Sequence, residues 1–343
     1  MILDFKTHKQ NTYNCYDAMI AVVGDYYSID IAPIFLDSFG FVYQANEIKE
    51  LSLNSSIGYI TNYNDDFLRD FCGIEVKYTQ KDLDIEGIVI NNIKTQELTG
   101  IHMDSFYLPW SKMQYEHHQN HFFIIIGFED NKYICIDNFL AEGIVSIDKK
   151  IINENALRAI KFAFNKNNII KYDLSDIITI ILKHIGNEQN HHIDHLKKFT
   201  FDFQNFSFNI DNYKIGSEAR FNLFQGLSNI EWSRYNFVRA LNYISDKFGS
   251  KVFENVIVLV NNAHNQWQIV KYTLIRSLLT NNKAYYAKKI SDMLYEITNT
   301  ETEIICTLLN LNNIYGIGSD YIGFTNITNC FNYNKRKYRK RNY

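Results

Sequence analysis

The sequence predicts an α+β fold, in which a first domain of mixed helices and strands precedes a mostly helical C-terminal half. Short segments that alternate between helix and strand character fill the chain up to about residue 145. Longer segments, whose apolar residues recur at helical spacing, fill the remainder. We therefore expect two domains, residues 1–145 and residues 146–343.

Helices and strands follow one another closely in the first domain. An apolar helix begins at Cys15, and a second helix covers NDDFLRDFC and ends at Gly73. The segment IEVKY predicts a strand, and GIVINNI predicts a further strand or a helix. Two β-rich runs, residues 122–127 and 132–136, then flank the polar turn residues EDN. This arrangement predicts a β-hairpin centred near Asp130.

The second domain is predicted from apolar stripes. Phe237, Leu241, Ile244 and Phe248 recur at intervals that place them on one face of a helix. Similar spacing occurs in four further segments, which are ENALRAIKFAF, SDIITIILKHI, HNQWQIVKYTLIRSLL and AYYAKKISDMLYEI. We expect each of these segments to be helical.

Charge and composition limit the function classes. The chain carries 35 basic and 38 acidic residues, so it lacks the overall basicity of a nucleic-acid binder. Its start, MILDFKTHKQ, lacks the features of a secretory signal, and no apolar run is long enough to span a bilayer. The five cysteines are scattered without a CxxC pair, and we expect all of them to be free thiols. A cytoplasmic protein that binds neither nucleic acid nor membrane is predicted.

Cys15 stands where a polar run becomes an apolar helix, in NTYNCYDAMIAVVGDYY. A free thiol has a pKa of about 8.5, and a helix N-terminus, an imidazole and a carboxylate that orients the imidazole would together activate it. Asn14 precedes the helix, and the predicted hairpin brings His121 beside Asp137. Cys15, His121 and Asp137 are therefore candidates for a catalytic triad. A buried structural cysteine is the alternative, and it is the commoner role of a cysteine on an apolar helix.

The stretch GIHMDSFYLPWSKMQYEHHQNHFFIIIGFEDNKYICIDN resembles the butirosin-biosynthesis BtrH N-terminal family. That family has an Asp-x-x-Tyr-Leu-Pro element, then a His that opens a strand, then a strand that ends in Asp. The residues that fit in order are Asp104, Tyr107, Leu108, Pro109, His121, Gly127, Phe128 and Asp137, and NCYDAM fits the Asn-Cys helix start. The resemblance covers roughly residues 10–140, with Asn138 where the family usually has proline. The chain is also similar to the amide synthetase of closthioamide biosynthesis.

The resemblance implies a papain-like cysteine-protease fold that is used for acyl transfer. An acyl or peptidyl carrier protein would pass its thioester-bound acyl group to Cys15, and a small amine or diamine would take it as an amide. His121 would be the base and Asp137 the residue that orients it. No cofactor is implied beyond the phosphopantetheinyl arm of the carrier.

Candidate oxyanion-hole and substrate-binding residues are Gln10, Asn14, Asp104 and Tyr107, together with the backbone N–H of Cys15. No GxxxxGK[ST] or GxGxxG motif indicates a nucleotide site, and aminolysis of a thioester needs none. Two alternatives stay open. The same triad could serve a cysteine peptidase or thioesterase, in which water is the acceptor. The chain could also be a non-catalytic binding module, in which Cys15 is unreactive.

Histidine clusters give a rival interpretation. The segments HHQNH (117–121) and KHIGNEQNHHIDH (183–195) have spacings that could ligate zinc, but the second lacks the glutamate of HExxH. We expect no metal site. The tail NKRKYRKRNY carries six basic residues within 335–341. We interpret it as a solvated terminus, with attraction of an acidic carrier protein or of nucleic acid as the alternative.

Overall fold

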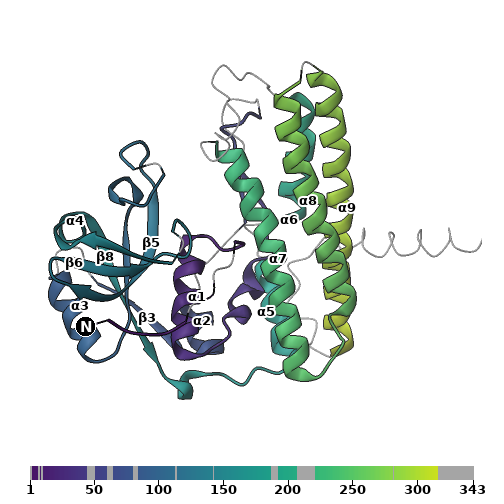
Figure 1. Ribbon diagram of the computed structural model, residues 1–343. Coiled ribbons are helices and arrows are strands. Elements are labelled where there is room, and N and C mark those ends of the chain that lie inside the picture. The colour runs from purple at the N-terminus through teal and green to yellow at the C-terminus, as the bar shows by residue number, and fades with distance from the viewer. Residues whose placement is uncertain are drawn as a thin grey trace, which may run out of the picture. The chain divides into compact units, whose positions relative to one another are not determined.

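The structure, a computed structural model, is α+β, with an antiparallel sheet and a helical C-terminal half (Figure 1). Two compact units are formed, one by Met1–Ile34 with Tyr63–Ile170 and the other by Phe35–Asn62 with Lys171–Tyr343. The boundary predicted between residues 145 and 146 falls inside strand β7 (Ile144–Asp148). The residues described are 2–6, 8, 11–44, 51–59, 65–79, 84–112, 114–141, 143–186, 192–206, 221–280 and 282–315.

A six-stranded antiparallel sheet forms the centre of the first unit, in the order β3-β8-β4-β5-β6-β7. The predicted strand IEVKY is β3 (Ile74–Tyr78), and the predicted hairpin is β5 (Asn120–Glu129) and β6 (Lys132–Ile136). Asp130 in the turn has a φ of 48°, a left-handed conformation that Asp tolerates better than most residues. These predictions are confirmed.

Two further predicted segments have different outcomes. The segment ENALRAIKFAF was expected to be helical, but only its start belongs to a helix, α4 (Lys149–Asn155), and the remainder is strand β8 (Ala156–Phe164). Because β8 hydrogen-bonds to both β3 and β4 (Thr99–Asp104), strand pairing outweighs the helix propensity of its Ala, Leu, Arg and Lys residues. The segment GIVINNI lies in a helix, α3 (Ile85–Lys94).

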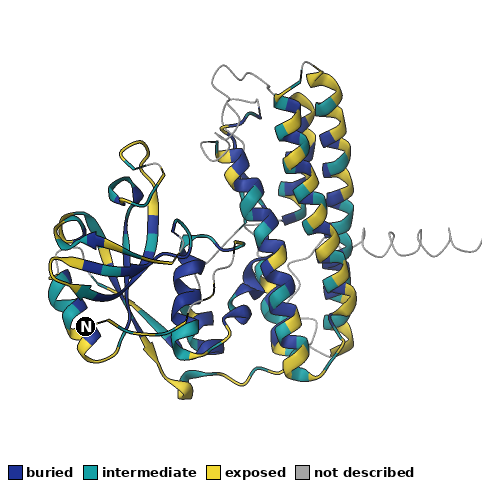
Figure 2. Ribbon diagram, in the orientation of Figure 1, coloured by how far each residue is buried: buried dark blue, intermediate teal, exposed yellow. Residues whose placement is uncertain are grey.

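Helices cover both faces of this sheet, and Figure 2 shows the burial that results. On one face, Val89 of α3 and Ile152 of α4 share a buried cluster with Ile101 and Phe123. On the other face lies α1 (Cys15–Tyr27), which approaches so closely that a Cβ at Gly100 would lie 2.9 Å from the Met19 sulfur. Helix α2 (Asp65–Cys72), predicted from NDDFLRDFC, packs beside β3. The predicted helix from Cys15 is thus confirmed, with its N-terminus at Cys15.

A capping box fixes the start of α1. The N–H of Asp17 donates to Asn14 Oδ1 at 2.9 Å, and the Asp17 carboxylate accepts from the N–H of Asn14 in return. Asn14 is therefore the N-cap, and Cys15 is the first residue of the helix. The Asp17 carboxyl is buried, which raises its pKa to about 7 although the Asn14 hydrogen bond opposes this shift.

We expect Asp17→Asn to be more stable than the wild-type protein at pH 8, by a few kcal/mol. The folded protein holds a proton on Asp17 up to about pH 7, whereas the unfolded chain releases it near pH 3.8. Wild-type stability should therefore fall as the pH rises between these values, and asparagine keeps the capping acceptor without titrating. Urea unfolding at pH 4, 6 and 8 measures the difference, with Asp130→Asn at the exposed turn as control. A stability difference that does not grow between pH 4 and pH 8 contradicts this prediction.

Long helices make up most of the second unit. Helix α7 (Asn222–Phe248) packs against α8 (Glu254–Leu278), and α8 packs against α9 (Lys283–Tyr315) (Figure 1). Helices α5 (Leu174–Gly186) and α6 (His192–Asp202) also pack against α9. The predicted helices at SDIITIILKHI, HNQWQIVKYTLIRSLL and AYYAKKISDMLYEI are confirmed. The predicted stripe from Phe237 also lies on a helix, and its first three residues are buried. Within the described ranges, no helix combines the length and apolar character needed to cross a bilayer.

A two-stranded sheet, β1 (Val42–Gln44) and β2 (Ser56–Gly58), completes the second unit. Strand β2 packs on α7, where a Cβ at Gly226 would collide with the backbone oxygen of Ile57. Glycine at position 226 therefore permits this close approach. Short 3-10 helices cover Ala32–Asp37, Ser105–Tyr107, Lys166–Asn168 and Phe203–Asn205.

Candidate functional site

Cys15 lies at the N-terminus of α1 with its side chain partly exposed. Its Sγ lies 3.9 Å from the backbone oxygen of Asn120, at the start of β5. Partial exposure at a helix N-terminus, where the helix dipole favours negative charge, suits a reactive thiol better than a structural one. Cys72 and Cys135 are buried thiols, and Cys306 is disulfide-bonded, so the expectation that all five cysteines are free thiols is wrong for Cys306.

The hairpin brings His121 and Asp137 into direct contact. Nε2 of His121 lies 2.7 Å from Oδ2 of Asp137, and both side chains are buried. Ile124 of β5 pairs with Ile136 of β6, which places the start of one strand beside the end of the other, as the sequence predicts. The Cys15 thiol is also a hydrogen-bonding neighbour of His121. Because Nε2 contacts Asp137, Nδ1 is the imidazole nitrogen that can contact Cys15.

Asp137 is held by four hydrogen bonds. Oδ1 accepts from the N–H groups of Phe139 and Leu140, each at 3.0 Å, and Oδ2 accepts from Trp110 Nε1 at 2.7 Å as well as from His121. Burial raises the pKa of Asp137, but these bonds and the His121 charge lower it by more than burial raises it, so the net shift is downward. Asp137 is therefore an ionised carboxylate in a fixed orientation.

His121 is consequently a protonated imidazole at neutral pH. Burial lowers its pKa, but the hydrogen bonds to Asp137 and Cys15 outweigh burial and raise the pKa to about 9. A positive imidazolium next to a thiol favours the thiolate and can return a proton to a leaving group. The three groups can thus perform nucleophilic chemistry with proton transfer.

Trp110 is a residue of this site that sequence reasoning missed as a functional group. It is the last residue of the DSFYLPW element. The only indication in the sequence is its residue type, because an indole N–H that becomes partly buried needs a hydrogen-bond acceptor. Asp137 is the acceptor, so Trp110 helps to fix the carboxylate that orients His121.

The other predicted site residues that the structure describes cap a helix or a turn, or pack on the core. Asn14 caps α1. Asp104 accepts from the N–H groups of Phe106 and Gln119, each at 3.0 Å, and caps the turn that contains Tyr107. Tyr107 packs against the buried cluster of the sheet. Gln10 lies outside the described residues, as does the basic tail, and the substrate-binding roles stay predictions.

The histidines proposed as zinc ligands have other neighbours. His118 Nδ1 lies 2.6 Å from Asp104, and His195 Nδ1 accepts from the Tyr43 N–H at 3.1 Å. His191 lies outside the described residues. In the part of the chain that the structure describes, no three His, Cys, Asp or Glu side chains are grouped so that they could hold a metal ion.

No model of a known protein family matches the chain, and no curated protein is found to be similar to it. The resemblance of residues 10–140 stays an expectation. What Cys15 does is therefore inferred from the groups that surround it.

Proposed function

We propose that the protein is a cysteine-dependent acyltransferase that makes an amide from a carrier-protein thioester and an amine. Cys15 is the nucleophile, His121 transfers protons, and Asp137 orients His121. One observation carries the proposal: a partly exposed thiol at a helix N-terminus neighbours a buried imidazole that is itself bound to a carboxylate at 2.7 Å. A structural cysteine would need neither partner.

The reaction has two halves. First, the Cys15 sulfur attacks the thioester carbonyl, the bond between that carbonyl and the carrier sulfur breaks, and the departing sulfur takes a proton from His121. The acyl group is then a thioester of Cys15. Next, the amine nitrogen attacks the same carbonyl, the Cys15 sulfur leaves, and His121 takes a proton from nitrogen. An amide is more stable than a thioester, so no ATP is needed.

We further propose that the first unit is papain-like. The support is that a nucleophile at a helix N-terminus precedes a base and an orienting residue on an antiparallel sheet. The resemblance of residues 10–140 favours an acyl or peptidyl carrier protein as donor and a small amine or diamine as acceptor, in the cytoplasm. Apart from the phosphopantetheinyl arm of the donor, the reaction requires no cofactor.

Product analysis tests the proposal. The protein is incubated with pantetheine thioesters that range from acetyl to benzoyl, with and without butylamine, and the products are quantified by chromatography and mass spectrometry. An acyltransferase gives amide when the amine is present. Free acid at the same rate with and without amine would instead support the thioesterase or peptidase, and no turnover of any thioester would support the binding module.

A further inference from the structure

Helix α8 turns one stripe of side chains away from the rest of its unit. Its buried residues, among them Val256, Trp267 and Leu274, lie on the opposite side of the helix. Figure 2 shows exposed residues along α8. Seven exposed residues form what we call the α8 stripe: Glu254, Val258, Asn261, Asn265, Ile269, Tyr272 and Arg276.

The α8 stripe is apolar for a helix face that meets solvent. Val258, Ile269 and Tyr272 are 55%, 50% and 58% exposed. A solvent-facing helix stripe normally carries charged and polar side chains. Here only the two end residues, Glu254 and Arg276, are charged. Large apolar side chains that recur along one exposed face indicate a protein interaction surface.

The spacing of the α8 stripe is the same in both directions from Asn265. Its residues follow one another at intervals of 4, 3, 4, 4, 3 and 4 positions. If two copies of α8 pack antiparallel about a two-fold axis at Asn265, each residue faces the one that is equally far from Asn265 on the other side. Val258 of one copy then faces Tyr272 of the other, and Asn261 faces Ile269. Asn265 faces its own equivalent.

The charges at the two ends complement each other in this arrangement. Glu254 and Arg276 are each 11 positions from Asn265, so the carboxylate of one copy faces the guanidinium of the other at both ends of the pair. Neither side chain has an ion-pair partner among the described residues. A parallel pair would instead place Glu254 against Glu254 and Arg276 against Arg276. The α8 stripe is therefore self-complementary when the two copies run antiparallel.

We propose that the α8 stripe binds a second copy of this chain, in an antiparallel two-fold pair centred on Asn265. Burial of the apolar side chains supplies the affinity. The two pairs of Glu254 with Arg276 fix the register, together with the Asn265 amides, which can hydrogen-bond to each other. An acidic carrier protein fits this face less well, because Arg276 is the only basic residue of the α8 stripe. The dimer goes beyond the proposed function and does not depend on the reaction at Cys15.

Sedimentation velocity of the full chain measures the association. At about 100 µM the wild-type protein should have twice the monomer mass of 40.4 kDa. Ile269→Asp places a carboxylate between the two helices and should weaken association about 100-fold. A wild-type protein that stays monomeric would overturn the inference, and if it then bound an acyl carrier protein and Ile269→Asp did not, the face would belong to the carrier. An Ile269→Asp variant that dimerises like the wild-type protein would overturn it too.

Exchange of the end charges tests the register. Glu254→Arg and Arg276→Glu each turn two attractive contacts into two repulsive ones, and each should weaken association about tenfold. The double variant Glu254→Arg, Arg276→Glu exchanges the charges and should return to nearly the wild-type affinity. Asp4→Arg, at an exposed residue of the first unit, is the control for the charge change and should have no effect. A double variant as weak as the single variants would contradict the antiparallel pair.

Cross-linking tests the position of the two-fold axis. In a Cys15→Ala background, Asn265→Cys should give a disulfide-linked dimer under mild oxidation, because its two copies face each other. Asn255→Cys, at another exposed position of α8, is the control. It lies ten positions from the axis, so its two copies are about 30 Å apart and should not cross-link. Equal yields from the two variants would overturn the pairing about Asn265.

Discussion

Replacement of His121 by asparagine is expected to slow acylation of Cys15 by about 10³-fold at pH 7. Asparagine cannot carry the positive charge that favours the thiolate or return a proton to the leaving sulfur, and its shorter side chain does not extend to the position of Nε2 beside Asp137. Single-turnover kinetics with hexanoyl-pantetheine measure the effect. His121→Asn with a rate within tenfold of wild type would contradict a role for His121 in proton transfer.

Companion variants show whether the site acts as a unit. Asp137→Asn should slow the same step, and the double variant with His121→Asn should be little worse than either single variant, because the residues act through one another. Trp110→Phe keeps an aromatic ring but removes the indole donor 2.7 Å from Asp137 Oδ2, so a smaller loss is expected. Multiplicative losses in the double variant would argue against a coupled pair.

The pH dependence has a defined sign. The pKa of His121 is raised from 6.5 to about 9, so its imidazolium is present below that value and is lost above it. The acylation rate should therefore decline as the pH rises through about 9. The stability that this pair contributes should be complete below pH 6.5 and be lost over the same rise.

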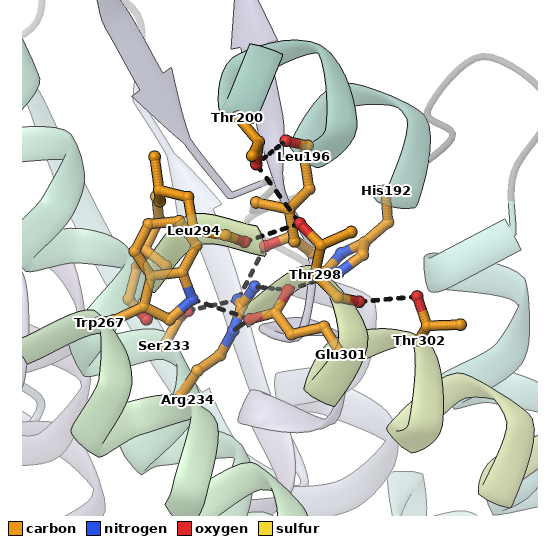
Figure 3. A network of polar contacts seen from close by, with 12 residues as sticks. His192, Leu196, Thr200, Ser233, Arg234, Trp267, Leu294, Thr298, Glu301 and Thr302 are labelled. Atoms are coloured by element: carbon orange, nitrogen blue, oxygen red, sulfur yellow. Dashed lines mark hydrogen bonds and ion pairs between the residues drawn. The ribbon is translucent and has the colours of Figure 1, made fainter. Parts of the chain in front are cut away.

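Replacement of Glu301 by glutamine is expected to destabilise the second unit by about 3–5 kcal/mol. The Glu301 carboxylate is fully buried and accepts from Arg234 Nε at 2.9 Å, Arg234 Nη2 at 3.0 Å and Trp267 Nε1 at 2.8 Å (Figure 3). Arg234 also donates to the backbone oxygen of Gly40 at 2.8 Å. Glutamine would leave the guanidinium buried without a counter-ion. The amide nitrogen that replaces one oxygen cannot accept a hydrogen bond, so helix α9 would also lose part of its polar contacts with α7 and α8.

The charge balance of this network involves mainly Glu301 and Arg234. His192 Nε2 lies 2.6 Å from Glu301 Oε2, and burial lowers the pKa of His192 although the Glu301 carboxylate opposes this shift. Burial raises the pKa of Glu301, but the charge of Arg234, followed by that of His192, lowers it to about 2. The stabilisation should therefore be present above pH 4.5 and be lost only as the pH falls toward 2.

Urea unfolding of Glu301→Gln measures this effect. The exposed Glu296 on the same helix provides the control, and Glu296→Gln should change the unfolding free energy by less than about 0.5 kcal/mol. The double variant Arg234→Met, Glu301→Leu should cost less than Glu301→Gln, because it removes both charges together. Equal stability of Glu301→Gln and Glu296→Gln would contradict the importance of the buried pair.

The sequence was sufficient for the hairpin and for the contact between His121 and Asp137, because both depend on local order. A turn at Asp130 between two β-rich runs determines which residues meet at the open end. The sequence was insufficient for β8, whose Ala, Leu and Lys residues suit a helix and become a strand only between β3 and β4. The role of Trp110 could not be predicted either, because its acceptor Asp137 is 27 positions away in the sequence. The loop between β4 and β5, which contains Trp110, brings the two residues together.

The packing of residues 35–62 with the C-terminal helices could not be predicted for a similar reason. It depends on contacts between distant positions, such as Arg234 with the backbone of Gly40 and Gly226 with Ile57. Neither glycine produces a periodic signal in the sequence. Local patterns therefore predicted most of the helices, strand β3 and the hairpin of β5 and β6, whereas the other strands and the grouping of the elements required the three-dimensional structure.

Intact mass spectrometry tests the role of Cys15 most directly. After incubation with hexanoyl-pantetheine, the wild-type protein should gain the mass of one hexanoyl group, and peptide mapping should place that group on Cys15. Butylamine should remove it and yield the hexanoyl amide. Cys15→Ala should gain no mass. An adduct of equal yield on Cys15→Ala, or a wild-type protein that no thioester from acetyl to benzoyl modifies, would contradict the assignment of Cys15 as the nucleophile.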